Sequence, residues 1–191
     1  MDASDTFPRF VSEVDELVRR RLSAAEMVQR ITPGLEGLVA ARGWLGASKS
    51  RPVSGKPYSQ YLLHLSADGP WSVVSFVWPA GSSTPVHDHG CWGVVGVYQG
   101  EETETAFLQL AGDRELGSLS LERAGTRIMR AGDVAGIVPP DDIHQVSNRG
   151  EETAISIHVY GADIGAQRRH AFDPASGEVK SFVSGYDRPA S

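Results

Sequence analysis

Apolar residues near the N-terminus recur at intervals of three or four, which is typical of an amphipathic helix. Its apolar positions are Phe10, Val11, Val14, Leu17 and Val18. Ser23, followed three residues later by Glu26, matches a capping box and predicts a second short helix through Ile31. Pro33-Gly34 is expected to end that helix before a third helical stretch at 35–42. The chain therefore begins with a predicted layer of helices.

From residue 46 onward the pattern changes to short apolar or alternating runs, divided by turn signals such as Asp68-Gly69. The candidate strands are 58–65, 71–78, 92–98, 102–110, 116–123, 126–130, 134–138, 144–147 and 154–160. Many short strands with no helical pattern between them predict an antiparallel sandwich or barrel of the jelly-roll kind. We expect one mainly β domain over 1–191, with helices at 1–45, a barrel at 46–160 and a C-terminal segment, 161–191, that wraps around the barrel.

Composition and charge narrow the class of protein. A chain of 191 residues suits one domain, and 18 Lys and Arg against 24 Asp and Glu give a net charge of −6 with no basic cluster. Nucleic acid and acidic membrane surfaces are therefore not expected as partners. No apolar run is long enough to span a bilayer, and the single cysteine, Cys91, fits a reducing compartment. We expect a cytoplasmic protein, and its oligomeric state stays open.

Two histidines in the run Pro85-Val86-His87-Asp88-His89-Gly90 are candidate metal ligands. In an extended chain, residues two apart point to the same face, so both imidazoles can reach one ion. By itself such a pair is as often an ordinary surface feature. Downstream, however, Pro139-Pro140 precedes His144 at the start of a predicted strand, where a third ligand would be aimed at the same point.

These two segments, about fifty residues apart, resemble the two-motif signature of cupins. Most cupins carry a glutamate four or five residues after the second histidine, and those positions here are Gly93 and Val94. The resemblance thus implies a double-stranded β-helix barrel with His87, His89 and His144 as the metal ligands. Three neutral imidazoles leave the metal its full charge and open positions, which favours an anionic ligand such as a thiolate.

The predicted strand at 154–160 alternates strictly, so that Ser156, His158 and Tyr160 share one face. Taken alone, such a polar face more commonly points to solvent. Next to a three-histidine cupin site, it resembles the thiol dioxygenases of the cysteine dioxygenase family, over residues 58–169. The resemblance implies Fe(2+) as cofactor, a small thiol and O2 as partners, and a sulfinate product. It also implies that Ser156, His158 and Tyr160 form a hydrogen-bonded catalytic relay.

Two departures from the mammalian type of this family bear on the substrate. Gln60 stands where that enzyme has a carboxylate-binding arginine, and Gly93 stands where it has a cysteine that is cross-linked to the relay tyrosine. Both are features of the bacterial 3-mercaptopropionate dioxygenase branch. That branch implies an arginine after the relay strand, matched here by Arg168 with Arg169 as the fallback. The substrate-binding residues would then be Arg168, Gln60 and Tyr160.

Other functions remain open from the sequence. The nearest is a cysteine dioxygenase that uses Arg168 for the substrate carboxylate. A non-catalytic cupin that binds a metal-chelated small molecule belongs to a different class, although it has no need of a polar relay beside the metal. Three histidines with an open position also describe hydrolytic zinc centres, and ligand type alone does not separate zinc from iron.

Overall fold

The computed structural model describes residues 3–67 and 70–189, so the expected turn at Asp68-Gly69 lies outside the described residues. Two helices, α1 (Ala3–Arg19) and α2 (Ala24–Ala40), and the 3-10 turn η1 (Ala47–Lys49) precede the strands. The strands are β1 (Ser59–Leu65), β2 (Ser72–Trp78), β3 (Val86–His87), β4 (Gly93–Gln99), β5 (Glu101–Asp113), β6 (Ser118–Arg130), β7 (Val134–Ile137), β8 (His144–Ser147), β9 (Ala154–Tyr160), β10 (Arg169–Phe172) and β11 (Val179–Phe182).

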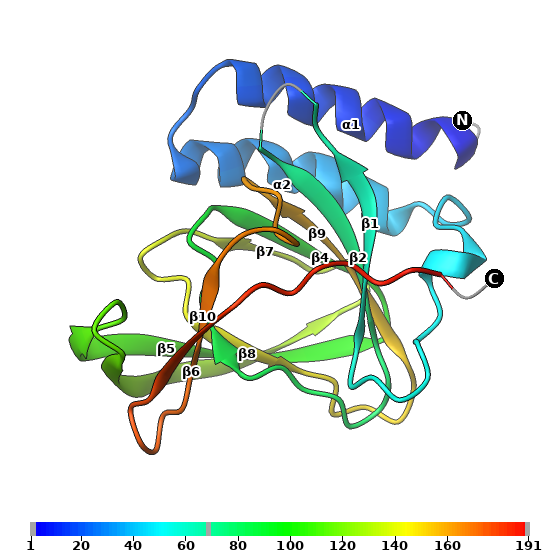
Figure 1. The fold of residues 1–191 in the computed structure, drawn as a ribbon. Helices are drawn as coiled ribbons and strands as arrows, with labels where there is room; N and C mark the ends of the chain where they lie inside the picture. The colour runs from blue at the N-terminus through cyan, green and yellow to red at the C-terminus, as the bar shows by residue number, and fades with distance from the viewer. Residues whose placement is uncertain (1–2, 68–69, 190–191) are drawn as a thin grey trace.

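The strands form two antiparallel sheets that face each other, with both helices outside one of them (Figure 1). One sheet has the order β1-β2-β9-β4-β7, and the other has the order β11-β10-β3-β8-β5-β6. The mainly β, cupin-like barrel with helices at its N-terminus is therefore confirmed. Neither helix in the described part of the chain is long and apolar enough to cross a membrane.

The central strands of the sheet beneath the helices are buried on both faces. Every residue of β2 and β9 is buried, and only the last residue of β4 is exposed. Ile155, Ile157 and Val159 of β9 belong to the same apolar cluster as Leu35 and Leu38 of α2. The helices thus cover the aliphatic face of β9, and its alternate side chains must point into the barrel.

The expected helix break at Pro33-Gly34 is wrong, because α2 runs through both residues. An internal proline costs a helix about 3 kcal/mol. That cost is offset by a continuous apolar stripe on both sides of the proline, formed by the buried residues Met27, Ile31, Leu35, Leu38 and Val39. The helix lies so close to β4 that a Cβ added to Gly96 would come 2.9 Å from Val39 Cγ1.

The strands also differ from expectation, and β3 at Val86–His87 was not among the candidate strands. The runs 116–123 and 126–130 form the single strand β6, because pairing with β5 continues past Gly125 through a register shift between Ala106 and Phe107. The C-terminal segment was not expected to contain strands, yet β10 pairs with β3 and β11 pairs with β10. The chain after β11, drawn in red, then crosses the front of the barrel (Figure 1).

Candidate metal centre

The three predicted histidine ligands converge inside the barrel. His87 lies on β3 directly opposite His144 on β8, and His89 follows two residues after His87. Their ring centroids are 4.8–4.9 Å apart, and one nitrogen from each ring lies within 4.8 Å of the others. All three residues are buried. This is the spacing at which three imidazoles can bind one ion.

Hydrogen bonds decide which nitrogen of each ring faces the others. Each Nδ1 atom has a protein acceptor, which leaves the Nε2 atoms for the centre. The acceptors of His87, His89 and His144 are the carbonyl oxygen of Pro85 at 3.1 Å, the carbonyl oxygen of Asp142 at 3.2 Å and the carboxylate of Glu104 at 2.7 Å. Nε2 of His89 is buried without a hydrogen-bond partner among the described residues. A metal ion would satisfy it.

The charge state of the cluster fits a divalent metal as well. Burial lowers the pKa of His87 and of His89 well below the usual histidine value, so both imidazoles are neutral and can act as ligands. Burial would raise the pKa of Glu104, but the hydrogen bonds and charges of His144 and Arg127 keep it below its usual range. The carboxylate that holds His144 is therefore ionised.

Two aspartates fix the loop that carries His87 and His89. One carboxylate oxygen of Asp142 accepts hydrogen bonds from the backbone N–H groups of His89 and Gly90, both at 2.9 Å. Asp88, between the two ligands, accepts from the backbone N–H of His170 at 2.7 Å and from the guanidinium of Arg114 at 2.7 Å. The ligand loop is therefore tied to β8, β10 and the β5–β6 hairpin.

The polar face of β9 points toward the metal centre. The hydroxyl of Tyr160 lies 2.7 Å from Nδ1 of His158, and Nε2 of His158 lies 2.7 Å from the hydroxyl of Ser156. Ser156 also accepts a hydrogen bond from the indole N–H of Trp78 at 3.0 Å. The ring of Tyr160 stacks on that of His89, with centroids 5.4 Å apart. The three predicted relay residues are thus linked by a series of hydrogen bonds that ends at Tyr160, beside the candidate metal ligand His89.

Burial sets the protonation of this chain of groups. It lowers the pKa of His158 to about 3, so its imidazole is neutral, and it raises the pKa of Tyr160 above the usual tyrosine value. The positive charge of Arg169 adds to the lowering of the pKa of His158 and offsets part of the rise in the pKa of Tyr160. A neutral imidazole has one donor and one acceptor nitrogen, so it can hydrogen-bond to Ser156 and to Tyr160 at the same time.

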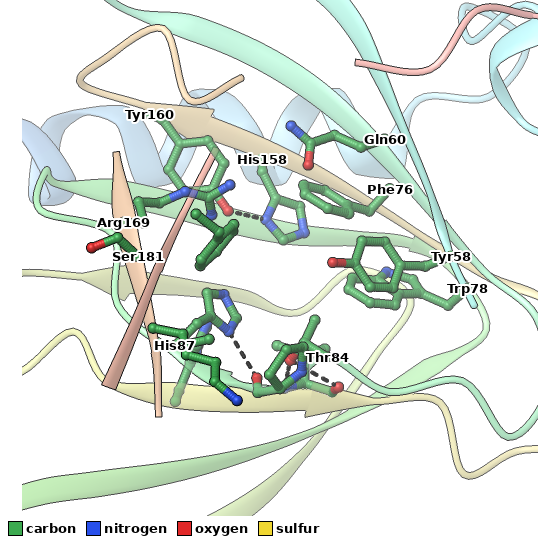
Figure 2. Close-up of a pocket in the computed structure, with 16 residues that line it drawn as sticks. Tyr58, Gln60, Phe76, Trp78, Thr84, His87, His158, Tyr160, Arg169 and Ser181 are labelled. Atoms are coloured by element: carbon green, nitrogen blue, oxygen red, sulfur yellow. Dashed lines mark hydrogen bonds between the residues drawn. The ribbon is translucent and has the colours of Figure 1, made fainter. Parts of the chain in front are cut away.

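A cavity of about 390 Å³ opens beside the histidines. Figure 2 shows Tyr160 and His158 on one side of it, Tyr58 and Trp78 on another, and Arg169 reaching in from β10. Gln60 of β1 also lines this space, as the sequence analysis expected of a substrate-binding residue. Its side chain is buried, with only 4% of the residue exposed.

The arginine at this cavity is not the expected one. Arg168 is exposed and is not among the lining residues, whereas Arg169 is 4% exposed and lines the cavity. The reason is strand parity, because Arg169 is the first residue of β10 and pairs with Phe182 of β11. Nε of Arg169 is buried with no hydrogen-bond partner in the described chain. Of the two arginines, the structure thus places at the cavity Arg169, the fallback from the sequence, and leaves Arg168 on the surface.

Gly93 lies against the relay tyrosine. It pairs with Tyr160 across β4 and β9, and a Cβ added to it would come 3.0 Å from Cδ1 of Tyr160. Cys91 is two residues away, and burial raises the pKa of its thiol to about 12. The strand position that faces the tyrosine thus carries no side chain.

A family model described as cysteine dioxygenase type I matches residues 2–174. The chain belongs to this family. Solved structures of similar fold include an oxalate oxidase with the substrate analogue glycolate (19% identity, TM-score 0.46, 61% of this chain and 57% of that one). They also include a cupin domain from Schizosaccharomyces pombe (18%, 0.43, 56% and 66%) and a double-stranded β-helix protein from Klebsiella pneumoniae (16%, 0.47, 75% and 93%). The chain thus spans less than two thirds of the first two structures, and at these identities the likeness concerns the fold alone.

Several residues at this cysteine dioxygenase family site were not predicted as functional. Glu104 and Asp142 hold metal ligands, and Tyr58 and Trp78 line the cavity. An available signal was the alternation Glu102-Thr103-Glu104 on a predicted strand, because one face of that strand had to carry both acids. The contribution of the C-terminal segment had no such signal.

Proposed function

We propose that this protein is a non-haem iron(II) thiol dioxygenase that converts a small thiol carboxylate and O2 to the sulfinate, with 3-mercaptopropionate as the preferred substrate. Membership of the cysteine dioxygenase type I family supports the reaction class. The observation that carries the substrate class is Arg169. It is a buried guanidinium in the cavity beside the three histidines, and it forms no ion pair with a carboxylate among the described residues.

Arg169 would bind the substrate carboxylate. A buried cation without an anionic partner is costly, and a carboxylate supplies both charge and hydrogen-bond acceptors. The unpartnered Nε of Arg169 is one donor for that purpose. The side chain of Gln60, which lines the same space, adds an amide that can orient the substrate.

The cavity favours a thiol without an amino group. None of the described residues that line it is an aspartate or a glutamate, while Arg169 and Lys180 are both cations. The ammonium group of cysteine would therefore lose water without gaining a charged partner. This absence is the reason for preferring 3-mercaptopropionate to cysteine.

The relay holds the hydroxyl of Tyr160 in a fixed orientation. Neutral His158 bonds Tyr160 on one side and Ser156 on the other, and Trp78 fixes Ser156. The hydroxyl can then donate to a negatively charged group on the substrate without first reorganising. Iron(II) held by His87, His89 and His144 would supply the activation of dioxygen, and the thiol itself supplies all four electrons.

The first experiment compares thiols. The iron-loaded protein is assayed for oxygen uptake with 3-mercaptopropionate, cysteine and cysteamine. The proposal predicts the highest kcat/KM for 3-mercaptopropionate, and the lowest for cysteamine because it lacks a carboxylate. Faster turnover of cysteine would identify a cysteine dioxygenase, and no sulfinate from any of the three would rule out the reaction class.

The second experiment tests the arginine. Arg169→Ala should raise the KM for 3-mercaptopropionate by roughly 10- to 100-fold, the size expected for loss of hydrogen bonds to a charged group. Arg168→Ala is the matched control, because it removes an exposed guanidinium from the adjacent position. A larger effect from Arg168→Ala would contradict the assignment.

A further inference from the structure

The C-terminal segment 179–187 forms one wall of the cavity. Lys180, Ser181 and Phe182 of this segment line it, and the following residues cross the front of the barrel (Figures 1 and 2). The segment lies beyond residues 2–174, over which the family model matches. The residues that this segment adds to the cavity wall therefore lie outside the region that the family model matches.

Ser184 in this segment joins the two side chains assigned to the substrate. Its hydroxyl oxygen accepts a hydrogen bond from Nη2 of Arg169 at 2.7 Å and another from Nε2 of Gln60 at 3.3 Å. Arg169 belongs to β10 and Gln60 belongs to β1, which lie in different sheets. A single hydroxyl thus bridges the two sheets at the cavity.

Arg169 has few other constraints. Its guanidinium lies over the ring of Phe182, with Cζ 4.8 Å from the centroid, a contact that does not depend on a particular N–H group. Nε has no partner in the described residues. Among the described residues, the hydrogen bond to Ser184 is the only one that the guanidinium makes, so it limits how the group can rotate and leaves Nε as an unused donor in a residue that lines the cavity.

Asp187 anchors the segment that carries Ser184. Its backbone N–H donates to the carbonyl of Gln60 at 2.7 Å, and its carboxylate accepts from the backbone N–H of Gln60 at 2.9 Å. The same carboxylate forms an ion pair with Lys56. These contacts of Asp187 hold the segment against the backbone of Gln60 without the side chain of Ser184.

We propose that Ser184 is a positioning residue, which holds Arg169 and Gln60 in the orientation that binds a substrate carboxylate. This inference rests on the proposed function, in which those two side chains receive the carboxylate. A guanidinium that is already oriented loses less conformational freedom when it binds, so Ser184 contributes to affinity without touching the substrate. Removing the hydroxyl should weaken carboxylate binding by about 3- to 10-fold, the range of one lost hydrogen bond.

The test is calorimetric titration of the iron-loaded protein under anaerobic conditions. Ser184→Ala should raise the Kd for 3-mercaptopropionate by that factor, and Ser184→Thr should restore it because threonine keeps the hydroxyl. The Kd for cysteamine, which has no carboxylate, should not change in Ser184→Ala. Ser176→Ala is the matched control, since its hydroxyl bonds Asp173 in the turn between β10 and β11. It should bind both thiols as the wild type does.

A double variant separates this inference from the proposed function. Because Ser184 acts mainly through its shorter hydrogen bond, the one from Arg169, Ser184→Ala should weaken binding of 3-mercaptopropionate less in the Arg169→Ala background than in the wild type, and the remainder is the part that acts through Gln60. Wild-type affinity in Ser184→Ala, together with weak binding in Arg169→Ala, would overturn the inference and leave the proposed function standing. Equal weakening for cysteamine would also overturn it, as it would show a general structural effect. Wild-type affinity in Arg169→Ala would contradict the carboxylate site itself.

Discussion

Glu104 holds the imidazole of His144 by a hydrogen bond of 2.7 Å, and this contact should tune metal affinity. Loss of such a partner typically weakens metal binding by about 10- to 100-fold, because the imidazole becomes less basic and less well oriented. We expect this range for Glu104→Ala in a competition titration with a chelator. Glu101→Ala, from the partly exposed neighbouring acid on β5, should leave the affinity unchanged. Equal effects of the two variants would contradict the role of Glu104.

Glu102 should make stability depend on pH. It is 3% exposed, and burial raises the pKa of its carboxyl from 4.5 to about 7, although nearby Ser156 and Trp78 lower it in part. Between these two pH values Glu102 is more protonated in the folded protein than in the unfolded chain, so its contribution to the unfolding free energy falls as the pH rises. A shift of this size corresponds to a fall of about 3 kcal/mol, complete above pH ~7.

Glu102→Gln should remove that fall, since the amide does not titrate. The measurement is denaturant unfolding of the metal-free protein at pH 5 and pH 8. Glu122→Gln, at an exposed position of β6, should keep the wild-type pH dependence. If the change in unfolding free energy from pH 5 to pH 8 were the same in Glu102→Gln as in the wild type, Glu102 would not have a raised pKa in the folded protein.

Gly93 leaves room for the ring of Tyr160. A Cβ at this position would lie 3.0 Å from Cδ1 of the ring, so Gly93→Ala must displace Tyr160 by a few tenths of an ångström. In the proposed function the hydroxyl of Tyr160 must be held in position, so we expect kcat with 3-mercaptopropionate to fall on the order of 10-fold. Gly125→Ala meets open space and should keep the wild-type kcat. An unchanged kcat in Gly93→Ala would mean that the position of Tyr160 is not critical.

At the residue scale, the histidine cluster and the polar face of β9 could be predicted because strand alternation fixes which side chains share a face. The choice between Arg168 and Arg169 could not. The two arginines are adjacent after a segment without periodicity, and only the pairing of β10 with β3 and β11 determines which one points inward. Glu104 was missed because its partner His144 is forty residues away in the sequence.

Helix α2 stabilises the barrel through a few fully buried side chains. Leu35 has no exposed surface and packs over β4, where Gly96 allows close approach. Leu35→Ala should lower the unfolding free energy by about 2–5 kcal/mol, the range for a large-to-small change in a core. Leu116→Ala, at a position that is 84% exposed, should change it little when both are measured by urea unfolding. Similar values for the two variants would show that α2 is not part of the core.

At the scale of elements, the predictions failed where tertiary contacts, and not the local sequence, decide the structure. The apolar stripe of α2 was visible in the sequence, but the local signal of Pro33-Gly34 suggested a break that packing against β4 overrides. Strand β11 has a half-exposed pattern and no clear alternation of apolar residues. It forms because β10 offers an edge for pairing, and a sequence pattern does not contain that information.

At the scale of the whole molecule, the site depends on closure of the barrel. The histidines come from the sheet that contains β3 and β8 and from the loop after β3, the polar triad comes from β9 in the other sheet, and the residues proposed to bind the carboxylate come from β1 and β10. No single element carries the complete set among the described residues. The fold class was predictable from the series of short strands, whereas the meeting of residues from both sheets required the three-dimensional structure.

The proposed dioxygenase reaction is tested most directly by following both oxygen atoms of O2 into the product. The iron-loaded protein is supplied with 3-mercaptopropionate and ¹⁸O₂, and the product is analysed by mass spectrometry beside the oxygen consumed. A thiol dioxygenase predicts a sulfinate with label in both oxygens, one O2 consumed per product and no need for a reductant. Disulfide as the sole product, or a sulfur product carrying oxygen from water, would contradict it.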